Sequence, residues 1–335
     1  MSWPPREFAE LWNQRERRHL RDLNRMAHPK LKFTVFTSAF NAARTLHRVY
    51  ESLESQTLRD FEWLVVDDGS ADGTPAIVSA WQTRSPFPIR LERQDHSGTA
   101  ASFNRAISLA RGELFFQIDH DDGCVPNALE RLWDAWRQIP ERARSAYGGL
   151  YVRSCDEDGR PNGPGFGMPW RDATFHEQYY RFRVREDQRP CWVTKVIRKF
   201  PAPILNGFSG WLPEGLTEAR VGRAYMSRWL NEVLYIYFQA DRNRATFSGN
   251  GRNFPHWPGL RAQYQEQVAF DARWLRYAPL QFYRRAAAYA RFSFRLGVGL
   301  VLQWQELRTG LGRALWLTAL PVGLALNLVD QRQGR

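Results

Sequence analysis

The stretch FEWLVVDDGSADGT, residues 61–74, decides the fold class. It begins as a run of apolar residues that favour a β-strand and changes at Asp67 and Asp68 into a turn rich in Gly, Ser and Asp. Asp72 can then cap a helix. A strand that ends in a polar turn and leads into a helix is the repeating unit of a parallel α/β sheet. The stretch therefore predicts an α/β protein.

The same order of elements recurs on both sides of this stretch. Further strands are predicted at LKFTVFT, IRLERQ and GELFFQID, which are residues 31–37, 89–94 and 112–119. Apolar residues recur at helical spacing between them, in residues 45–56, 100–110 and 127–138. This alternation predicts a mainly parallel sheet flanked by helices.

Carboxylates gather where the second and fourth predicted strands end, which is where open α/β sheets bind ligands. Asp67 or Asp68 can accept a hydrogen bond from a uracil imide or a ribose hydroxyl. Asp119, Asp121 and Asp122 crowd one turn and repel one another unless a cation intervenes. Hard oxygen ligands suit Mg²⁺ or Mn²⁺ bridged to a substrate diphosphate. A simple turn cap and a solvated acidic turn remain the alternatives.

Three segments together resemble inverting glycosyltransferase family 2. They are TSAFNAARTLHRVYESLESQTLRDFEWLVVDDGSADGT, GTAASFNRAISLARGE and FFQIDHDDG, in this order and spacing. The resemblance is closest over residues 31–135 and continues through Trp192 and the LPEG segment to NEVLYIYF. It implies a GT-A fold, an activated sugar donor and a divalent ion, Mn²⁺ or Mg²⁺.

The resemblance also implies roles for individual residues. Asp68, with Asp67, resembles the carboxylate that recognises the base, and Asp119 and Asp121 resemble the DxD pair for ribose and metal. Asp122 is a further candidate metal ligand. The other candidate donor-binding residues, around the nucleoside base and before the helix that follows the third strand, are Thr37, Phe40, Asn41 and Gly98.

An inverting transfer needs a general base for the acceptor hydroxyl. The segment LPEGLTEARVGRAY offers Glu214 at a predicted helix start, where the family presents an acidic residue. Glu218 lies one turn later on the same face and is the second candidate. An acid that only stabilises a helix N-terminus is the alternative for Glu214.

One feature departs from the family, because GTAASFN carries no cation where relatives often place one beside the diphosphate. Contacts to the diphosphate are therefore expected from elsewhere. The candidates follow the YIYF strand in a basic loop, for which a merely solvated role is the alternative: Arg242, Arg244, Thr246 and Ser248.

The charge is unevenly distributed over the 335 residues. The formal net charge is +12, but residues 31–219 carry 23 basic and 25 acidic side chains, whereas residues 220–335 carry 17 and 6. A near-neutral candidate catalytic segment argues against a nucleic-acid enzyme. Three widely spaced cysteines and a charged N-terminus without an apolar run predict a cytoplasmic protein.

Four regions are predicted: an amphipathic helical arm at 1–30, a nucleotide-sugar half at 31–150, an acceptor half at 151–260 and a basic, aromatic helical extension at 261–335. In the extension, residues 314–329 would form a helix of about 24 Å, short of the roughly 30 Å core of a bilayer. An interfacial helix on the inner face of the membrane is expected. A helical bundle packed on the catalytic part or on a partner subunit is the alternative, and no oligomeric state is predicted.

The whole sequence predicts a metal-dependent inverting glycosyltransferase. It would move a sugar from a nucleotide donor, with UDP-sugars favoured, to a glycan, polysaccharide or lipid-linked acceptor. The alternative is a non-catalytic, membrane-attached protein that binds sugar nucleotides or acts as a scaffold. Nucleotidyl transfer would call for a Gly-rich basic loop after the first strand, which TSAFNAAR lacks.

Overall fold

The computed structural model of the chain describes residues 31–205, 208, 212–238 and 256–332. Two predicted segments lie outside these residues. They are the amphipathic arm at 1–30 and the basic loop with Arg242, Arg244, Thr246 and Ser248.

The described part of the chain is built on a nine-stranded mixed sheet with the order β3-β2-β1-β4-β8-β6-β9-β5, and β7 pairs with β9. The first four strands are β1 (Phe33–Ala39), β2 (Phe61–Asp67), β3 (Ile89–Arg93) and β4 (Leu114–Gln117). The others are β5 (Gly123–Cys124), β6 (Tyr147–Cys155), β7 (Trp170–Ala173), β8 (Gln188–Val193) and β9 (Met226–Ile236). Strands β1 to β4 pair in parallel, as predicted, and antiparallel pairing begins where β8 joins β4.

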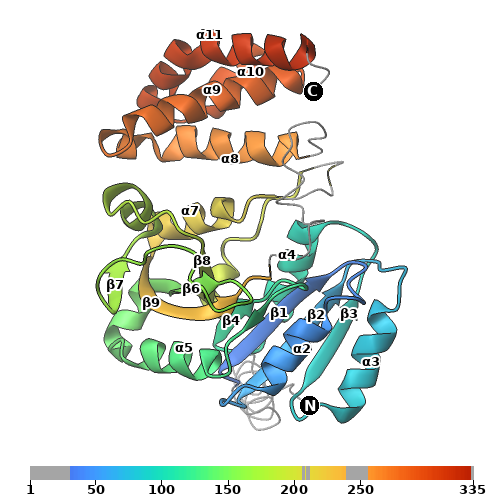
Figure 1. Cartoon of the computed structure of the whole chain (residues 1–335). Coiled ribbons are helices and arrows are strands. Elements are labelled where there is room, and N and C mark those ends of the chain that lie inside the picture. The colour runs from blue at the N-terminus through green and yellow to red at the C-terminus, as the bar shows by residue number, and fades with distance from the viewer. Residues whose placement is uncertain (1–30, 206–207, 209–211, 239–255, 333–335) are drawn as a thin grey trace, which may run out of the picture.

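Helices cover both faces of this sheet (Figure 1). The helices of this part of the chain are α2 (His47–Glu54), α3 (Thr74–Arg84), α4 (Thr99–Leu109), α5 (Ala128–Arg137), η1 (Glu141–Ala146), the π-helical η2 (Glu177–Arg181), α6 (Thr194–Ile197) and α7 (Gly215–Ala224). The periodic segments at 45–56, 100–110 and 127–138 correspond to α2, α4 and α5. These observations confirm the α/β class.

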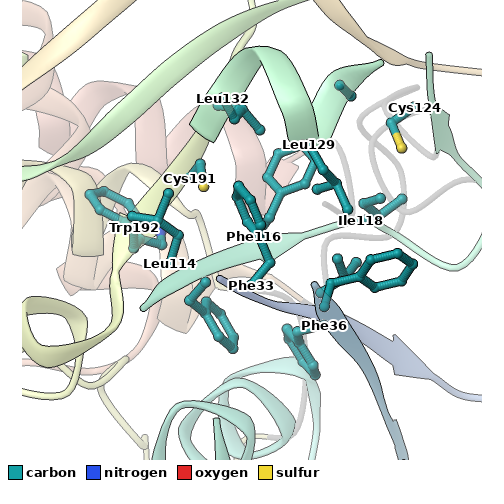
Figure 2. Packing of buried hydrophobic residues seen from close by; sticks show 14 of the residues in the cluster. Phe33, Phe36, Leu114, Phe116, Ile118, Cys124, Leu129, Leu132, Cys191 and Trp192 are labelled. Atoms are coloured by element: carbon teal, nitrogen blue, oxygen red, sulfur yellow. The ribbon is translucent and has the colours of Figure 1, made fainter. Parts of the chain in front are cut away.

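The core lies where apolar faces of the strands meet the helices. Figure 2 shows part of this core, which includes Phe33 and Phe36 of β1, Phe116 of β4, Leu129 of α5 and Trp192 of β8. All five side chains are buried. Burying one such side chain contributes about 1.5–3 kcal/mol, so this cluster stabilises β1 and β4 against the elements packed on them.

Two loops meet at that edge because of the strand register. Ala39, the last residue of β1, pairs with Asp67, the last residue of β2. The Asn41 amide then donates to Ser70 Oγ at 2.9 Å, and the Asn41 side-chain oxygen accepts from Ala71 N at 2.9 Å. Asn41 has a φ of 50°, a left-handed conformation that Asn tolerates better than most residues. Both loops are thereby held together beside the sheet.

A second layer of helices lies beyond α7 (Figure 1). It contains α8 (Trp257–Phe270), η3 (Ala272–Arg276), α9 (Pro279–Arg295), α10 (Leu300–Glu306) and α11 (Gly310–Arg332). Arg223 of α7 connects the layers, because it donates to Glu266 at 2.6 Å and to Asp271 at 2.8 Å. Burial opposes ionisation of Asp271, but bonds from His176 and Arg223 hold its pKa below the usual range. The ion pairs of Arg223 with Glu266 and Asp271 are therefore a charged contact between the sheet and the helical layer.

Helix α11 is longer than the sequence predicted. It has 23 residues and includes Pro321, so its length at 1.5 Å per residue is about 34 Å. The predicted helix at 314–329, about 24 Å long, lies within α11, which begins before the apolar run and ends after it. By length and composition, α11 is the one helix in the described residues that could cross a membrane.

Candidate active site

A cavity of about 910 Å³ opens beside the ends of β1 and β4. Its other walls come from β8, the first turn of α4 and the first turn of α7. It therefore lies at the carboxyl edge of the parallel strands, where α/β sheets bind ligands. Its volume is within the range of about 300–1,000 Å³ that small-molecule sites occupy.

The carboxylates of the acidic turn after β4 do not all face the cavity. Asp119 and Asp121 line the cavity. The Asp119 carboxylate accepts from Gln117 Nε2 at 3.0 Å, and the Asp121 carbonyl accepts from Arg48 at 3.1 Å. Asp122 is buried instead and accepts from the Tyr235 hydroxyl at 2.8 Å. The structure thus brings two of the three predicted metal ligands to the cavity.

These two carboxylates fit a divalent ion that keeps other ligands from solvent or substrate. Within the described residues, no group of three or more His, Cys, Asp or Glu side chains could hold a metal. Mg²⁺ typically uses one or two carboxylates together with substrate phosphates and water. The donor set of Asp119 and Asp121 is consistent with that use and not with a closed protein cage.

Asp67 and Asp68 are buried and hydrogen-bonded to their own chain. Asp67 accepts from Ser70 N at 3.2 Å and from Arg93 Nε at 3.0 Å. Asp68 accepts from Gln94 Nε2 at 2.7 Å and from the backbone amides of Ser97 and Gly98, both at 2.9 Å. Neither carboxylate lines the cavity. Recognition of a base by Asp68 would therefore require one of these hydrogen bonds to be exchanged.

The predicted base pocket is only partly assembled around the cavity. Phe40 and Asn41 line it, and the Phe40 ring stacks on His96 with centroids 4.3 Å apart. Thr37 is buried away from it and accepts from Trp63 Nε1 at 3.1 Å. Gly98 is the residue before α4 and does not line the cavity, whereas its neighbour Thr99 does.

Arg189 of β8 was not predicted, although it is the central charge of the cavity. Its side chain is 12% exposed and its Nη1 lies 3.3 Å from Asp119 and 3.4 Å from Glu214. Burial alone would lower its pKa, but Tyr235, Asp119 and Glu214 raise the pKa well above its usual value. Arg189 therefore stays charged and links the acidic turn to α7.

Glu214 and Glu218 line the same cavity from one face of α7. Glu214 is 45% exposed, into the cavity. Burial in the cavity raises the pKa of Glu214 to about 7, Arg189 opposes this, and Asp119 adds to it. Burial also raises the pKa of Glu218 well above its usual value, with a further contribution from Glu214. A carboxylate with a near-neutral pKa is suited to act as a general base.

Two further polar groups reach the cavity from the loop after β1 and the acidic turn. Arg44 lines it, and so does His120, whose Nδ1 lies 3.1 Å from Thr45 Oγ1. The start of α4 contributes Thr99 and Ala100 and directs a helix N-terminus, which favours anions, toward the same space. Arg44 and Arg189 thus provide positive charge that the α4 sequence lacks.

The cavity thus combines two acidic groups from the turn after β4, a buried arginine and a carboxylate with a pKa near neutral. This arrangement defines an α/β protein with a polar ligand site. Residues 34–202, about half of the chain, match the model of glycosyl transferase family 2. The chain belongs to this family.

Curated relatives match about a third of the chain. A cholesterol galactosyltransferase from Borreliella burgdorferi is 34% identical over 105 residues, which are 31% of this chain and 29% of the relative. A chondroitin synthase from Escherichia coli is 32% identical over 105 residues, which are 31% of this chain and 15% of the relative. The chain thus spans less than a third of the length of either relative.

Solved structures match over more of the chain. S. aureus TarS (residues 1–349) in complex with UDP-GlcNAc has a TM-score of 0.56 and 20% identity, and the match covers 91% of this chain and 93% of that chain. The same fragment without a stated ligand has a TM-score of 0.54 and 17% identity, and covers 91% and 92%. The likeness confirms the GT-A fold.

Proposed function

We propose that the chain is an inverting glycosyltransferase that moves a sugar from a nucleotide-sugar donor, with UDP-sugars favoured, to a glycan, polysaccharide or lipid-linked acceptor. One observation carries the proposal. Asp119 and Asp121 line the same cavity as Glu214, and Arg189 links the two walls through contacts of 3.3 and 3.4 Å. A donor diphosphate and an acceptor hydroxyl can therefore be bound within one space.

In the proposed reaction Glu214 accepts the proton of the acceptor hydroxyl. The hydroxyl oxygen forms a bond to the anomeric carbon, and the bond from that carbon to the diphosphate breaks, with its electron pair leaving on the nucleoside diphosphate. The raised pKa of Glu214, about 7, makes it a stronger base than an ordinary carboxylate while leaving much of it ionised at neutral pH. Arg189 and Arg44 would stabilise the negative charge on the departing group.

Asp119 and Asp121 are the residues that would hold Mn²⁺ or Mg²⁺. A bound ion would neutralise charge on the diphosphate. Asp122 would not contact the ion but would position the acidic turn, because it accepts a hydrogen bond from the Tyr235 hydroxyl of β9.

Donor binding and transfer are tested separately. UDP-GlcNAc and other sugar nucleotides should raise the melting temperature of the full chain, more strongly with Mn²⁺, because a ligand that binds the native state stabilises it. Glu214→Gln should keep this shift and lose at least about 100-fold in transfer or donor hydrolysis. The same measurements on Glu218→Gln, one turn away, distinguish the two candidate bases, because loss of transfer in that variant alone would assign the role to Glu218. Donor binding without turnover in the parent chain would favour the non-catalytic alternative.

We further propose that α11 docks the protein on the cytoplasmic membrane surface. Two of its polar side chains are buried against the helical layer: Asp330 forms a bidentate pair with Arg291, with both contacts at 2.6 Å, and Asn327 is buried nearby. Apolar side chains cover the outward face instead: Leu311, Leu317, Val322, Leu324, Leu326, Leu328 and Val329. Exposed apolar surface with basic residues nearby suits an anionic bilayer surface.

The membrane proposal predicts co-sedimentation with vesicles that contain anionic phosphatidylglycerol. Leu324→Gln with Leu328→Gln should reduce the bound fraction several-fold, because both side chains are exposed and their loss should not affect folding. Ile204→Gln, an exposed apolar residue outside the helical layer, should bind as the parent does. Unchanged vesicle binding in the double variant, together with dissociation of a dimer, would show that this face contacts a second subunit instead.

A further inference from the structure

A second cavity lies between η2, α8 and α9, outside the candidate active site. Its volume is about 350 Å³, and two arginines, three glutamines and two tyrosines line it. No carboxylate and no aliphatic side chain is among these lining residues. Such a lining is polar, aromatic and positively charged, which distinguishes it from a gap in the apolar core.

The positive charge of this cavity is not neutralised by the protein around it. Arg284 is exposed and forms no ion pair within the described residues. Arg285 contacts the Tyr180 hydroxyl, and its guanidinium lies over the Tyr179 ring at 5.5 Å from the centroid. The nearby carboxylate of Glu266 is already paired with arginines of α7. The cavity therefore favours an anion.

Gln267 adds a polar side chain to the wall of this cavity. It lines the cavity and is 8% exposed, and its side-chain oxygen is fully buried without a hydrogen-bond partner in the described part of the chain. An unsatisfied buried amide costs about 1–3 kcal/mol. Gln263 and Gln281 bring further amide groups to the same wall.

This cavity is next to the helix that carries the candidate base. Gln263 is so close to α7 that a Cβ atom on Gly215 would lie 3.1 Å from its Nε2. Gly215 directly follows Glu214, which lines the larger cavity. Gln263, which lines the smaller cavity, therefore packs against the residue that follows Glu214.

We infer that the smaller cavity binds one saccharide unit that carries a phosphate or a carboxylate. Arginine recognises either anion with paired N–H donors. Glutamine amides can donate to and accept from sugar hydroxyls, and tyrosine rings offer apolar faces to a sugar ring. The volume is at the lower end for small-molecule sites, as one such unit requires. Its use as a subsite for a growing acceptor would rest on the proposed transfer reaction, but binding itself does not.

The test uses the full chain and four probes in isothermal titration calorimetry: glucose 6-phosphate, glucuronate, glucose and inorganic phosphate. At least one anionic saccharide should bind tenfold or more tightly than glucose and than phosphate, and the stronger of the two identifies the anion. Equal binding of inorganic phosphate and the anionic saccharides would overturn the inference, because only charge would then be recognised.

Two variants locate the binding. Arg284→Gln should weaken the preferred probe at least tenfold, whereas Arg308→Gln, which removes an exposed charge from the same helical layer, should not. Gln267→Met should weaken it without lowering the melting temperature, because the unsatisfied buried amide is removed. Normal probe binding in both Arg284→Gln and Gln267→Met would exclude this cavity. The melting shift with sugar nucleotides should be the same in all variants, so a failure here differs from a failure of the proposed transferase.

Discussion

Replacing Arg189 with Met should move the pH dependence of activity to higher pH. The variant removes the cation that lies 3.4 Å from Glu214. Even at the dielectric constant of water, two unit charges at this distance interact by about 1.2 kcal/mol, or about 0.9 pKa unit. Burial raises the Glu214 pKa to about 7 while Arg189 opposes that rise. Loss of Arg189 should therefore raise it to about 8.

The sign of the effect on activity follows from the role of a base. Glu214 must be deprotonated to accept a proton, so at pH 7 the active fraction falls from about one half to about one tenth. The value of kcat/KM should drop about fivefold from this cause at pH 7, and the difference should disappear near pH 9. If Arg189→Met also loses contacts to the donor, kcat/KM should fall by the same factor at every pH.

The assay is the pH profile of kcat/KM for transfer or donor hydrolysis, measured for the parent, Arg189→Met and Arg189→Lys. The lysine variant keeps the charge and should restore much of the original acid limb. An acid limb with the same midpoint in the parent and Arg189→Met would refute the assignment of Glu214 as the titrating base.

Three other perturbations test separate parts of the structure. Asp121→Asn should abolish the metal-dependent part of the sugar-nucleotide melting shift; a shift equal to that of the parent would remove Asp121 as a ligand. Asp68→Asn turns an amide donor toward groups that already donate, so urea denaturation should show a loss of about 1–3 kcal/mol. Gly323→Val should lower stability by about 1–3 kcal/mol through overpacking, because a Cβ there would lie 2.6 Å from Ala290 Cβ; the exposed Ala325→Val is its control, and equal melting temperatures would contradict the close packing.

Much of the parallel half of the fold could be predicted from the sequence. The strands β1, β2 and β4 are short apolar runs with polar ends, and local pattern alone marks such segments. Strand β8 gave no such signal because QRPCWV contains Pro190, which normally argues against a central strand. In the structure, β4 pairs only with Cys191 to Val193, so Pro190 lies past the end of that ladder and lines the cavity.

The candidate site was predictable where function depends on strand ends and not where it depends on tertiary contact. Asp119, Asp121 and Glu214 were candidates because of their positions in motifs, and all three line the cavity. Arg189 is one of many basic residues and becomes distinctive only when β8 lies between the acidic turn and α7. Burial of Asp122 is likewise set by Tyr235, which is more than a hundred positions away in sequence.

The exposed apolar face of α11 has a consequence for the geometry of a reaction at a membrane surface. If its apolar face rests on a bilayer, α8 and α9 become a spacer, because they lie between α11 and the sheet (Figure 1). The reacting groups would then work at a fixed height above the lipid headgroups. A sugar attached directly at the headgroup level would lie below their reach, whereas the outer end of a longer lipid-borne chain would meet them. The thickness of the helical layer would then determine the length of acceptor that can reach the active site.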